Sequence, residues 1–172
     1  MLQVREKDLL GAALLTLARG IVETAKPRGT VVVNDRLDVA LAAKAAGVHL
    51  PADGLPIAEA RRGTVKRFVI GRSVHSLAEA RQAQKDGADY LFFGPLFETQ
   101  GKTIDRPPQG PDALRKILEA VRIPVWAIGG VKPETAALLS GLPIAGVAAI
   151  SFIAAAPDPA GAVRALRAAL LG

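Results

Sequence analysis

The chain has 172 residues, of which 50% are hydrophobic and only 4% aromatic, so its core must be built from aliphatic side chains and alanine. It contains no cysteine, which excludes a disulfide framework, a thiolate nucleophile and a thiolate metal site. The formal net charge is +6, but the Lys and Arg residues are scattered and few aromatic rings are available to stack on bases. Small anionic substrates explain this charge as well as nucleic acid does, and we expect no nucleic-acid partner.

The apolar runs of the sequence are too short to span a bilayer. Residues 1–6 also lack the basic start and the apolar middle of a signal peptide. We therefore expect a cytoplasmic protein that does not contact a membrane. The length fits a single domain over residues 1–172, and the sequence shows no linker and no low-complexity tract.

Strand-like and helix-like stretches alternate along the whole chain, which predicts a parallel sheet with helices outside it. Gly47 is the expected C-terminal cap of one helix, and Ser76 with Glu79 forms the capping box of another. The expected strands cover residues 2–5, 30–33, 48–50, 68–71, 90–94, 124–128 and 146–150, and the expected helices cover residues 8–25, 37–47, 56–62, 76–86, 111–121, 133–140 and the segment from 158 onward.

These strands and helices make up one unit fewer than a closed (β/α)₈ barrel, which has eight strands. Because the chain begins directly on a strand, we expect an α/β barrel of the TIM type that lacks the first strand–helix unit. The strands beginning at Leu2 and ending at Ile150 would then have unpaired edges, and such edges pair readily with another chain. Either the two edges meet each other or a second copy of the chain covers them, and we favour a homo-oligomer.

The segment that begins at Tyr90 turns from a buried strand into a long polar loop. After Gly94-Pro95 the loop runs for about a dozen Gly- and Pro-rich residues, whereas roughly 2–6 residues are usual for such a connection. It contains the hydroxyl of Thr99 and the cation of Lys102. Ligands of parallel α/β proteins bind at the carboxyl ends of the strands, so a working loop is the better interpretation than an incidental connector.

Polar residues or glycines follow most of the other strands too, which predicts a site at the mouth of the barrel. They are Gln3, Arg5 and Lys7; Asn34 and Asp35; His49 with Asp53; Ser73 and His75; Gly129 and Gly130; and Ser151.

Gly129-Gly130 and Ser151 each precede a predicted helix, whose free N–H groups favour an anion, so this pair of loops predicts a phosphate site. The alternative for the glycines is a tight turn. Asp35 is a candidate Mg²⁺ ligand, and the alternative is an N-cap for the helix that starts at Leu37. His49 and the histidine at position 75 are either structural or catalytic, and no His/Glu spacing indicates zinc.

Eight motifs recur in the order of a known family over nearly the whole chain. They are Gln3-Val4-Arg5-Glu6-Lys7, Val33-Asn34-Asp35-Arg36, Gly47-Val48-His49-Leu50, Gly71-Arg72-Ser73-Val74-His75-Ser76, Asp86-Gly87-Ala88-Asp89-Tyr90, Gly94-Pro95-Leu96-Phe97-Glu98-Thr99, Ala127-Ile128-Gly129-Gly130 and Ile150-Ser151. In these motifs the sequence resembles the thiamin phosphate synthase family, including its TenI-type thiazole tautomerase branch. The family fold is a (β/α)₈ barrel, and its members normally carry one strand–helix unit before the first motif.

The resemblance implies a reaction in which a pyrimidine diphosphate loses pyrophosphate and a thiazole phosphate captures the resulting cation. It implies that Mg²⁺ binds at Asp35 with help from Asp53, and that Gly130, beside Gly129, and Ser151 bind the thiazole phosphate. Lys102, Thr99 and Ser73 would act on the departing diphosphate, where negative charge develops. The remaining residues implied to bind the pyrimidine diphosphate are Gln3, Lys7 and Asn34.

Three positions depart from the synthase or tautomerase pattern and leave alternatives open. The second Mg²⁺ carboxylate of synthases falls at Gly54, and a second threonine falls at Gly101. The proposed catalytic histidine of tautomerases falls at Pro95, which cannot transfer a proton, although Glu98 is near in sequence. The alternatives to a synthase are a thiazole tautomerase and a non-catalytic regulator that binds thiazole or thiamin phosphate.

Overall fold

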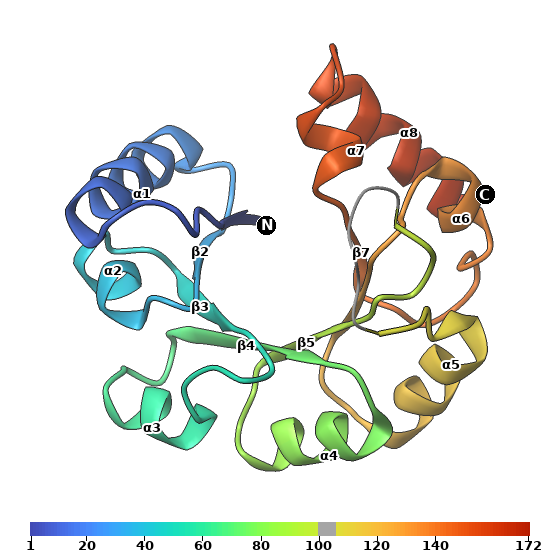
Figure 1. Ribbon diagram of the computed structural model, residues 1–172, viewed down its shortest axis with the longest axis horizontal. Coiled ribbons are helices and arrows are strands. Elements are labelled where there is room, and N and C mark those ends of the chain that lie inside the picture. Colours follow the sequence, from blue (N-terminus) through green and yellow to red (C-terminus); the bar gives the residue numbers. More distant parts are fainter. Residues whose placement is uncertain (100–105) are drawn as a thin grey trace. The chain divides into compact units, whose positions relative to one another are not determined.

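The computed structural model describes residues 1–99 and 106–172. Within these residues seven strands alternate with helices, and the strands follow chain order in the sheet, from β1 to β7 (Figure 1). The pairings among β1 to β4 and among β5 to β7 are parallel. The α/β class is therefore confirmed, and this order is that of a (β/α)₈ barrel with one strand–helix unit fewer.

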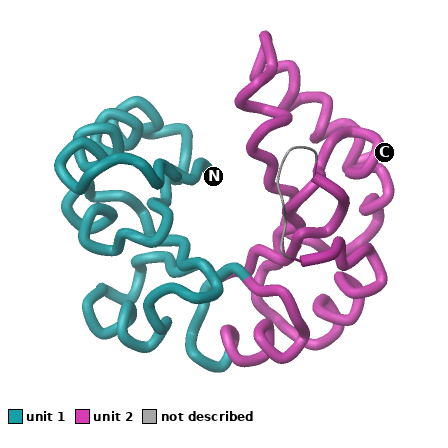
Figure 2. The backbone as a smooth tube through the Cα atoms, in the orientation of Figure 1, with its two compact units in different colours: residues 1–73, 85–89 teal, residues 74–84, 90–172 magenta. Residues whose placement is uncertain are grey.

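The chain divides into two compact units, shown in Figure 2. Unit 1 comprises residues 1–73 and 85–89, and unit 2 comprises residues 74–84 and 90–172. Among the described residues, no helix combines the length and the apolar character that crossing a bilayer requires.

Unit 1 contains the first strands and the helices between them. A row of buried aliphatic residues crosses the sheet, because Val4 pairs with Val33, Val33 with Val48, and Val48 with Ile70. β-Branched side chains suit such a pleated, buried surface. The elements are β1 (Leu2–Val4), α1 (Gly11–Ala25), β2 (Val31–Asn34), α2 (Leu37–Ala42), β3 (Gly47–Leu50), α3 (Ile57–Arg62) and β4 (Val69–Val74), of which Val74 belongs to unit 2.

The prediction that Gly47 caps a helix is wrong. Helix α2 ends at Ala42 in a Schellman-type turn, with Lys44 at φ 54° in the position that glycine usually takes. Gly47 instead opens β3, and a Cβ atom there would lie 2.1 Å from the carbonyl oxygen of Val69. The glycine is required by the close approach of β3 to β4.

Unit 2 contains the aromatic strand and the C-terminal helices. All residues of β5 are buried, and Val131 packs with Ala136 and Leu166 in a hydrophobic cluster of this unit. The elements are α4 (Leu77–Lys85), of which Lys85 belongs to unit 1, β5 (Tyr90–Phe93), α5 (Gly110–Ala120), β6 (Val125–Ile128), α6 (Pro133–Ala137), β7 (Gly146–Ala148), α7 (Ser151–Ala154) and α8 (Pro159–Leu171).

Two helices of unit 2 differ from the prediction. Helix α7 was not expected, since four residues are too few to produce a helical hydrophobic period. Helix α6 ends at Ala137 rather than at Ser140. The capping-box prediction for α4 is confirmed for one bond, because the Glu79 backbone N–H donates to Ser76 Oγ over 3.2 Å. The Glu79 carboxylate accepts from the backbone N–H of His75, 2.7 Å away, instead of from Ser76.

Candidate functional site

Five predicted site residues of unit 1 lie at or just after the carboxyl ends of β1 to β4. Because these strands are parallel, their carboxyl ends lie at the same end of the sheet. The structure thus brings together residues from four separate motifs, namely Gln3, Asn34, Asp35, His49 and Ser73.

Two side-chain hydrogen bonds connect neighbouring strands at this carboxyl end of the sheet. Gln3 Nε2 donates to Asn34 Oδ1 over 3.1 Å, and His49 Nε2 lies 2.8 Å from Ser73 Oγ. In each pair, the second residue lies two positions beyond the residue that is paired with the first, so both side chains are on the same face. The two amide side chains fix each other and keep the Gln3 oxygen and the Asn34 amide group for further hydrogen bonds.

His49 is the one buried polar or charged residue of the described chain, with 2% of its surface exposed. Burial, together with the positive charge of Arg72 as a smaller cause, lowers its pKa from 6.5 to about 3. The imidazole is therefore neutral at physiological pH.

Arg72 was not predicted as a site residue, yet it holds the turn that contains Asp53. Its guanidinium donates to the carbonyl oxygen of Leu55 over 2.9 Å and to that of Ala52 over 3.0 Å. Arginine suits this task because its planar group offers several donors in a fixed geometry. Its place in the motif from Gly71 to Ser76 was the only sequence signal for it.

Asp35 has φ 63°, in the left-handed region that Asp tolerates better than most residues. Its backbone N–H donates to the carbonyl oxygen of His49 over 2.8 Å, which fixes the residue to the end of β3. The N-cap alternative is wrong, because Arg36 is the N-cap residue of α2 and no side chain caps this helix. The exposed Asp35 carboxylate is thus available to a ligand.

The surroundings of Asp35 bear on whether Mg²⁺ can bind. A Cβ atom on Gly54 would lie 3.1 Å from Asp35 Oδ1, so position 54 adjoins this carboxylate and its glycine adds no second acidic group there. Asp53, one residue earlier, is exposed. The described residues contain no group of three or more His, Asp and Glu side chains able to hold a metal. One or two carboxylates still fit Mg²⁺, provided that substrate phosphate oxygens complete its shell.

In unit 2, the loop after β5 is fastened at its base. His75 Nδ1 donates to the carbonyl oxygen of Gly94, which assigns this histidine a structural contact. Gln109 Nε2 donates to the carbonyl oxygen of His75 over 2.7 Å, and the Gln109 backbone N–H donates to that of Pro95 over 3.0 Å. Sequence reasoning missed Gln109, because a lone glutamine in a polar loop gives no signal of its own.

Thr99 lies beyond this base. Its hydroxyl oxygen is buried and has no hydrogen-bond partner among the described residues. An unpaired buried hydroxyl costs about 1–3 kcal/mol, so an oxygen or N–H of a ligand would stabilise this arrangement. The predicted Lys102 lies outside the described residues.

Gly129 and Gly130 form a tight turn after β6, with φ 96° and 64°. A Cβ atom on Gly129 would lie 2.7 Å from Cα of Pro95, and one on Gly130 would lie 2.4 Å from the carbonyl oxygen of Glu98. Close packing against the β5–α5 loop therefore requires both glycines, whether or not a phosphate binds there.

The remaining predicted residues lie at exposed positions. Lys7 is in the loop that follows β1, and Ser151 is the first residue of α7. Neither helix after the two predicted phosphate loops is long, since α6 has five residues and α7 has four.

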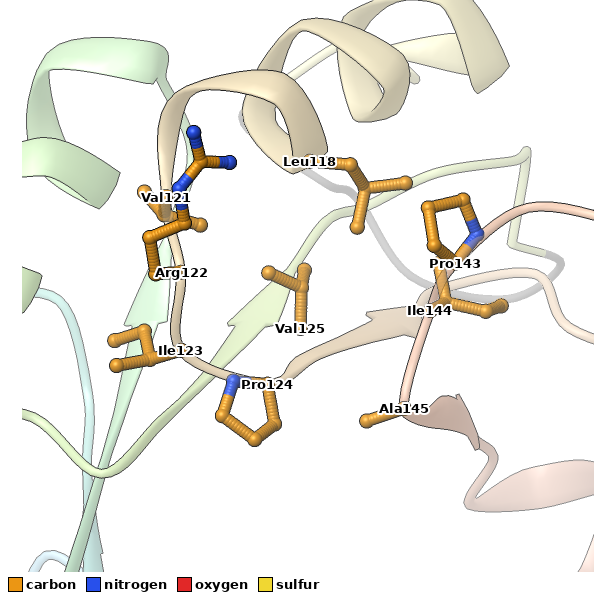
Figure 3. Close-up of a pocket in the computed structure, with 9 residues that line it drawn as sticks. All are labelled: Leu118, Val121, Arg122, Ile123, Pro124, Val125, Pro143, Ile144 and Ala145. Carbon is orange, nitrogen blue, oxygen red and sulfur yellow. The ribbon is translucent and has the colours of Figure 1, made fainter.

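An apolar hollow of about 370 Å³ lies at the opposite end of the strands of unit 2 (Figure 3). It adjoins Val125, the first residue of β6, and Ala145, which precedes β7. Leu118 of α5 and Pro143 also line it. Since ligands of this fold class bind at the carboxyl ends of the strands, we do not assign the hollow to the site.

The family model described as thiamine monophosphate synthase matches residues 1–153. The chain belongs to this family. It is 42% identical over 167 residues to the thiamine-phosphate synthase of Moorella thermoacetica, with 96% of the chain and 80% of that protein covered. It is also 44% identical over 167 residues to the bifunctional thiamine biosynthesis protein ThiM/ThiE of Symbiobacterium thermophilum, covering 96% of the chain and 35% of that longer protein.

Among solved structures, the thiamine phosphate pyrophosphorylase of Pyrococcus furiosus superposes with a TM-score of 0.88 at 36% identity, covering 99% of the chain and 83% of that structure. A 3-hexulose-6-phosphate synthase superposes with a TM-score of 0.73 at 21% identity, covering 98% and 86%. The second likeness concerns the fold alone. The family resemblance predicted from the motifs is confirmed.

Proposed function

We propose that this family member is a thiamin phosphate synthase, a transferase that joins hydroxymethylpyrimidine diphosphate to thiazole phosphate. In this reaction the bond between the pyrimidine methylene carbon and the diphosphate oxygen breaks, and pyrophosphate leaves. The thiazole nitrogen donates its electron pair to the methylene carbon and forms the new bond. The observation that carries the proposal is the 40–42% identity to thiamine-phosphate synthases over nearly the whole chain.

The residues of unit 1 suit recognition of the pyrimidine diphosphate. Gln3 and Asn34 offer an amide oxygen and an amide group in fixed positions, which matches the mixed donors and acceptors of an aminopyrimidine. The Ser73 hydroxyl is half-buried at the end of β4, where it can donate to a diphosphate oxygen. Lys7, in the exposed loop after β1, adds a cation for the same group.

Stabilisation of the leaving group is the main chemical demand, since negative charge develops on the departing pyrophosphate. The buried Thr99 hydroxyl supports a role there, because it has no partner among the residues 1–99 and 106–172. We assign Lys102 the role of a cation beside the same group. Asp35 and Asp53 would hold Mg²⁺, which supplies positive charge when it is bound.

The thiazole phosphate is assigned to Gly129, Gly130 and Ser151. Backbone N–H groups next to glycine can approach an anion closely because no side chain intervenes. The positive φ angles of the two glycines agree with such a turn, although packing alone also requires them.

A thiazole tautomerase is the second candidate, and the glycine at position 54 beside Asp35 favours it. Against it stands Pro95 at the position of the tautomerase histidine, which leaves Glu98, an exposed residue, as the base. A non-catalytic regulator that binds thiazole or thiamin phosphate is the third candidate, and no observation in the structure favours it.

The proposal is tested by incubating the protein with both substrates and Mg²⁺ and measuring thiamin phosphate by chromatography. Formation of thiamin phosphate and pyrophosphate in equal amounts supports a synthase that acts on small phosphorylated substrates. Isomerisation of thiazole phosphate without coupling would support the tautomerase. Binding without turnover of either kind would support the regulator.

A further inference from the structure

His49 and Ser73 form a hydrogen-bonded pair at the carboxyl ends of the neighbouring strands β3 and β4 in unit 1. His49 is buried on β3, and its Nε2 atom lies 2.8 Å from Ser73 Oγ on β4. The residue paired with His49 in the sheet is Gly71, which contributes no side chain between them. Ser73 lies two residues further along β4, on the same face as Gly71.

The number of protons in this pair allows two arrangements. Burial keeps the imidazole neutral, so one of its two nitrogens carries a proton, and the serine hydroxyl has one proton of its own. In the first arrangement His49 Nε2–H donates to Ser73 Oγ, and the hydroxyl proton is left for a third group. In the second, the hydroxyl donates to an unprotonated Nε2, and no proton remains for a ligand.

We propose that His49 is a positioning residue whose Nε2–H donates to Ser73 Oγ and thereby directs the Ser73 hydroxyl proton toward an oxygen of the departing diphosphate. This inference rests on the proposed function, which assigns Ser73 to the diphosphate. A diphosphate oxygen at neutral pH only accepts hydrogen bonds, so Ser73 can contact it only as a donor. The partner at His49 must therefore be the donor of the 2.8 Å contact.

The protonated nitrogen of His49 can be read directly by NMR. The chain has two histidines, so long-range ¹H–¹⁵N spectra of the ¹⁵N-histidine protein contain two sets of ring signals, and the His49 set is the one missing from His49→Gln. We expect a neutral ring protonated at Nε2. A ring protonated at Nδ1 would overturn this proposal, whereas the proposed synthase function would still stand.

The kinetic test uses two substitutions of different hydrogen-bonding capacity. His49→Met removes the donor at similar length, whereas His49→Gln retains an N–H near the position of Nε2. We expect His49→Met to lower kcat about tenfold, because it removes one hydrogen bond to Ser73, which contacts the charged diphosphate. We expect the kcat of His49→Gln to stay within about threefold of the wild-type value. The second arrangement predicts the reverse, because His49→Met would release the serine proton and leave kcat unchanged or raised.

Ser73→Ala supplies the control for a merely structural effect. If His49 acts through Ser73, then His49→Met in the Ser73→Ala background lowers kcat by less than about twofold further. An equal loss in both backgrounds means that His49 acts through packing alone and overturns the proposal. A wild-type protein without synthase activity would overturn the proposed function, and with it the role of Ser73.

Discussion

The buried His49 makes a definite prediction for stability as a function of pH. An unfolded histidine takes up a proton below pH 6.5, whereas His49 in the folded chain does so only near pH 3. Between these values the unfolded state binds more protons, so the free energy of unfolding falls as the pH falls from 6.5 to 3. Each unit of difference corresponds to about 1.4 kcal/mol, which gives a loss of roughly 2 kcal/mol between pH 7 and pH 5.

The assay is urea denaturation followed by circular dichroism at pH 7, 6 and 5, where most carboxylates remain ionised. The control is His49→Gln, which keeps every other titratable group, including His75. We expect the wild type to lose about 2 kcal/mol more than the variant over this range, whatever the absolute stability of either protein. Equal pH dependence in the two proteins would show that His49 does not titrate as its burial requires.

Three further predictions concern glycine packing, metal binding and the β5–α5 loop. Gly47→Ala should lower the free energy of unfolding by about 3 kcal/mol or more, because its Cβ would overlap the backbone of Val69. The control, Gly20→Ala in the open part of α1, should raise the free energy of unfolding by about 0.5–1 kcal/mol. Equal effects of the two substitutions in urea denaturation would refute the packing argument. Calorimetry with inorganic pyrophosphate should show that Mg²⁺ strengthens binding to the wild type but not to Asp35→Asn, and an unchanged Mg²⁺ effect would remove Asp35 from the metal site. Gln109→Leu should lower kcat/KM about tenfold with little change in melting temperature, because Gln109 holds the base of the β5–α5 loop and does not belong to the hydrophobic core. An unchanged kcat/KM would mean that the base of this loop does not position Thr99.

Much of the fold could be predicted from the sequence because the strand signals are strong. Stretches such as Val31-Val32-Val33 and Tyr90–Phe93 are short, apolar and buried, and the structure has strands there. The helix ends were harder. Lys44 adopts the left-handed conformation that normally marks a glycine, so the true end of α2 carried no sequence signal, and Gly47 attracted the prediction instead.

The positions of the candidate site residues after the strands were predictable from the sequence, but their hydrogen bonds were not. Gln3, Asn34 and Ser73 were identified by their place after strands, yet their hydrogen-bond partners depend on register, which a single sequence does not specify. Arg72 and Gln109 act through backbone carbonyls, and such contacts leave no compositional trace. The roles of all the candidate site residues, the binding of Mg²⁺ and the association of two copies stay predictions.

The turn after β6 and the loop after β5 are joined by backbone hydrogen bonds, with Leu96 N–H donating to Ile128 O over 2.9 Å and Phe97 N–H donating to Gly129 O over 3.0 Å. The proposed function gives these two segments different substrates, the diphosphate at Thr99 and the thiazole phosphate at Gly130. These two bonds join the segments, so a ligand that displaced one of them would also act on the other. Linkage then requires that such a coupling act equally in both directions, so each substrate would alter the affinity for the other by the same factor, whichever binds first.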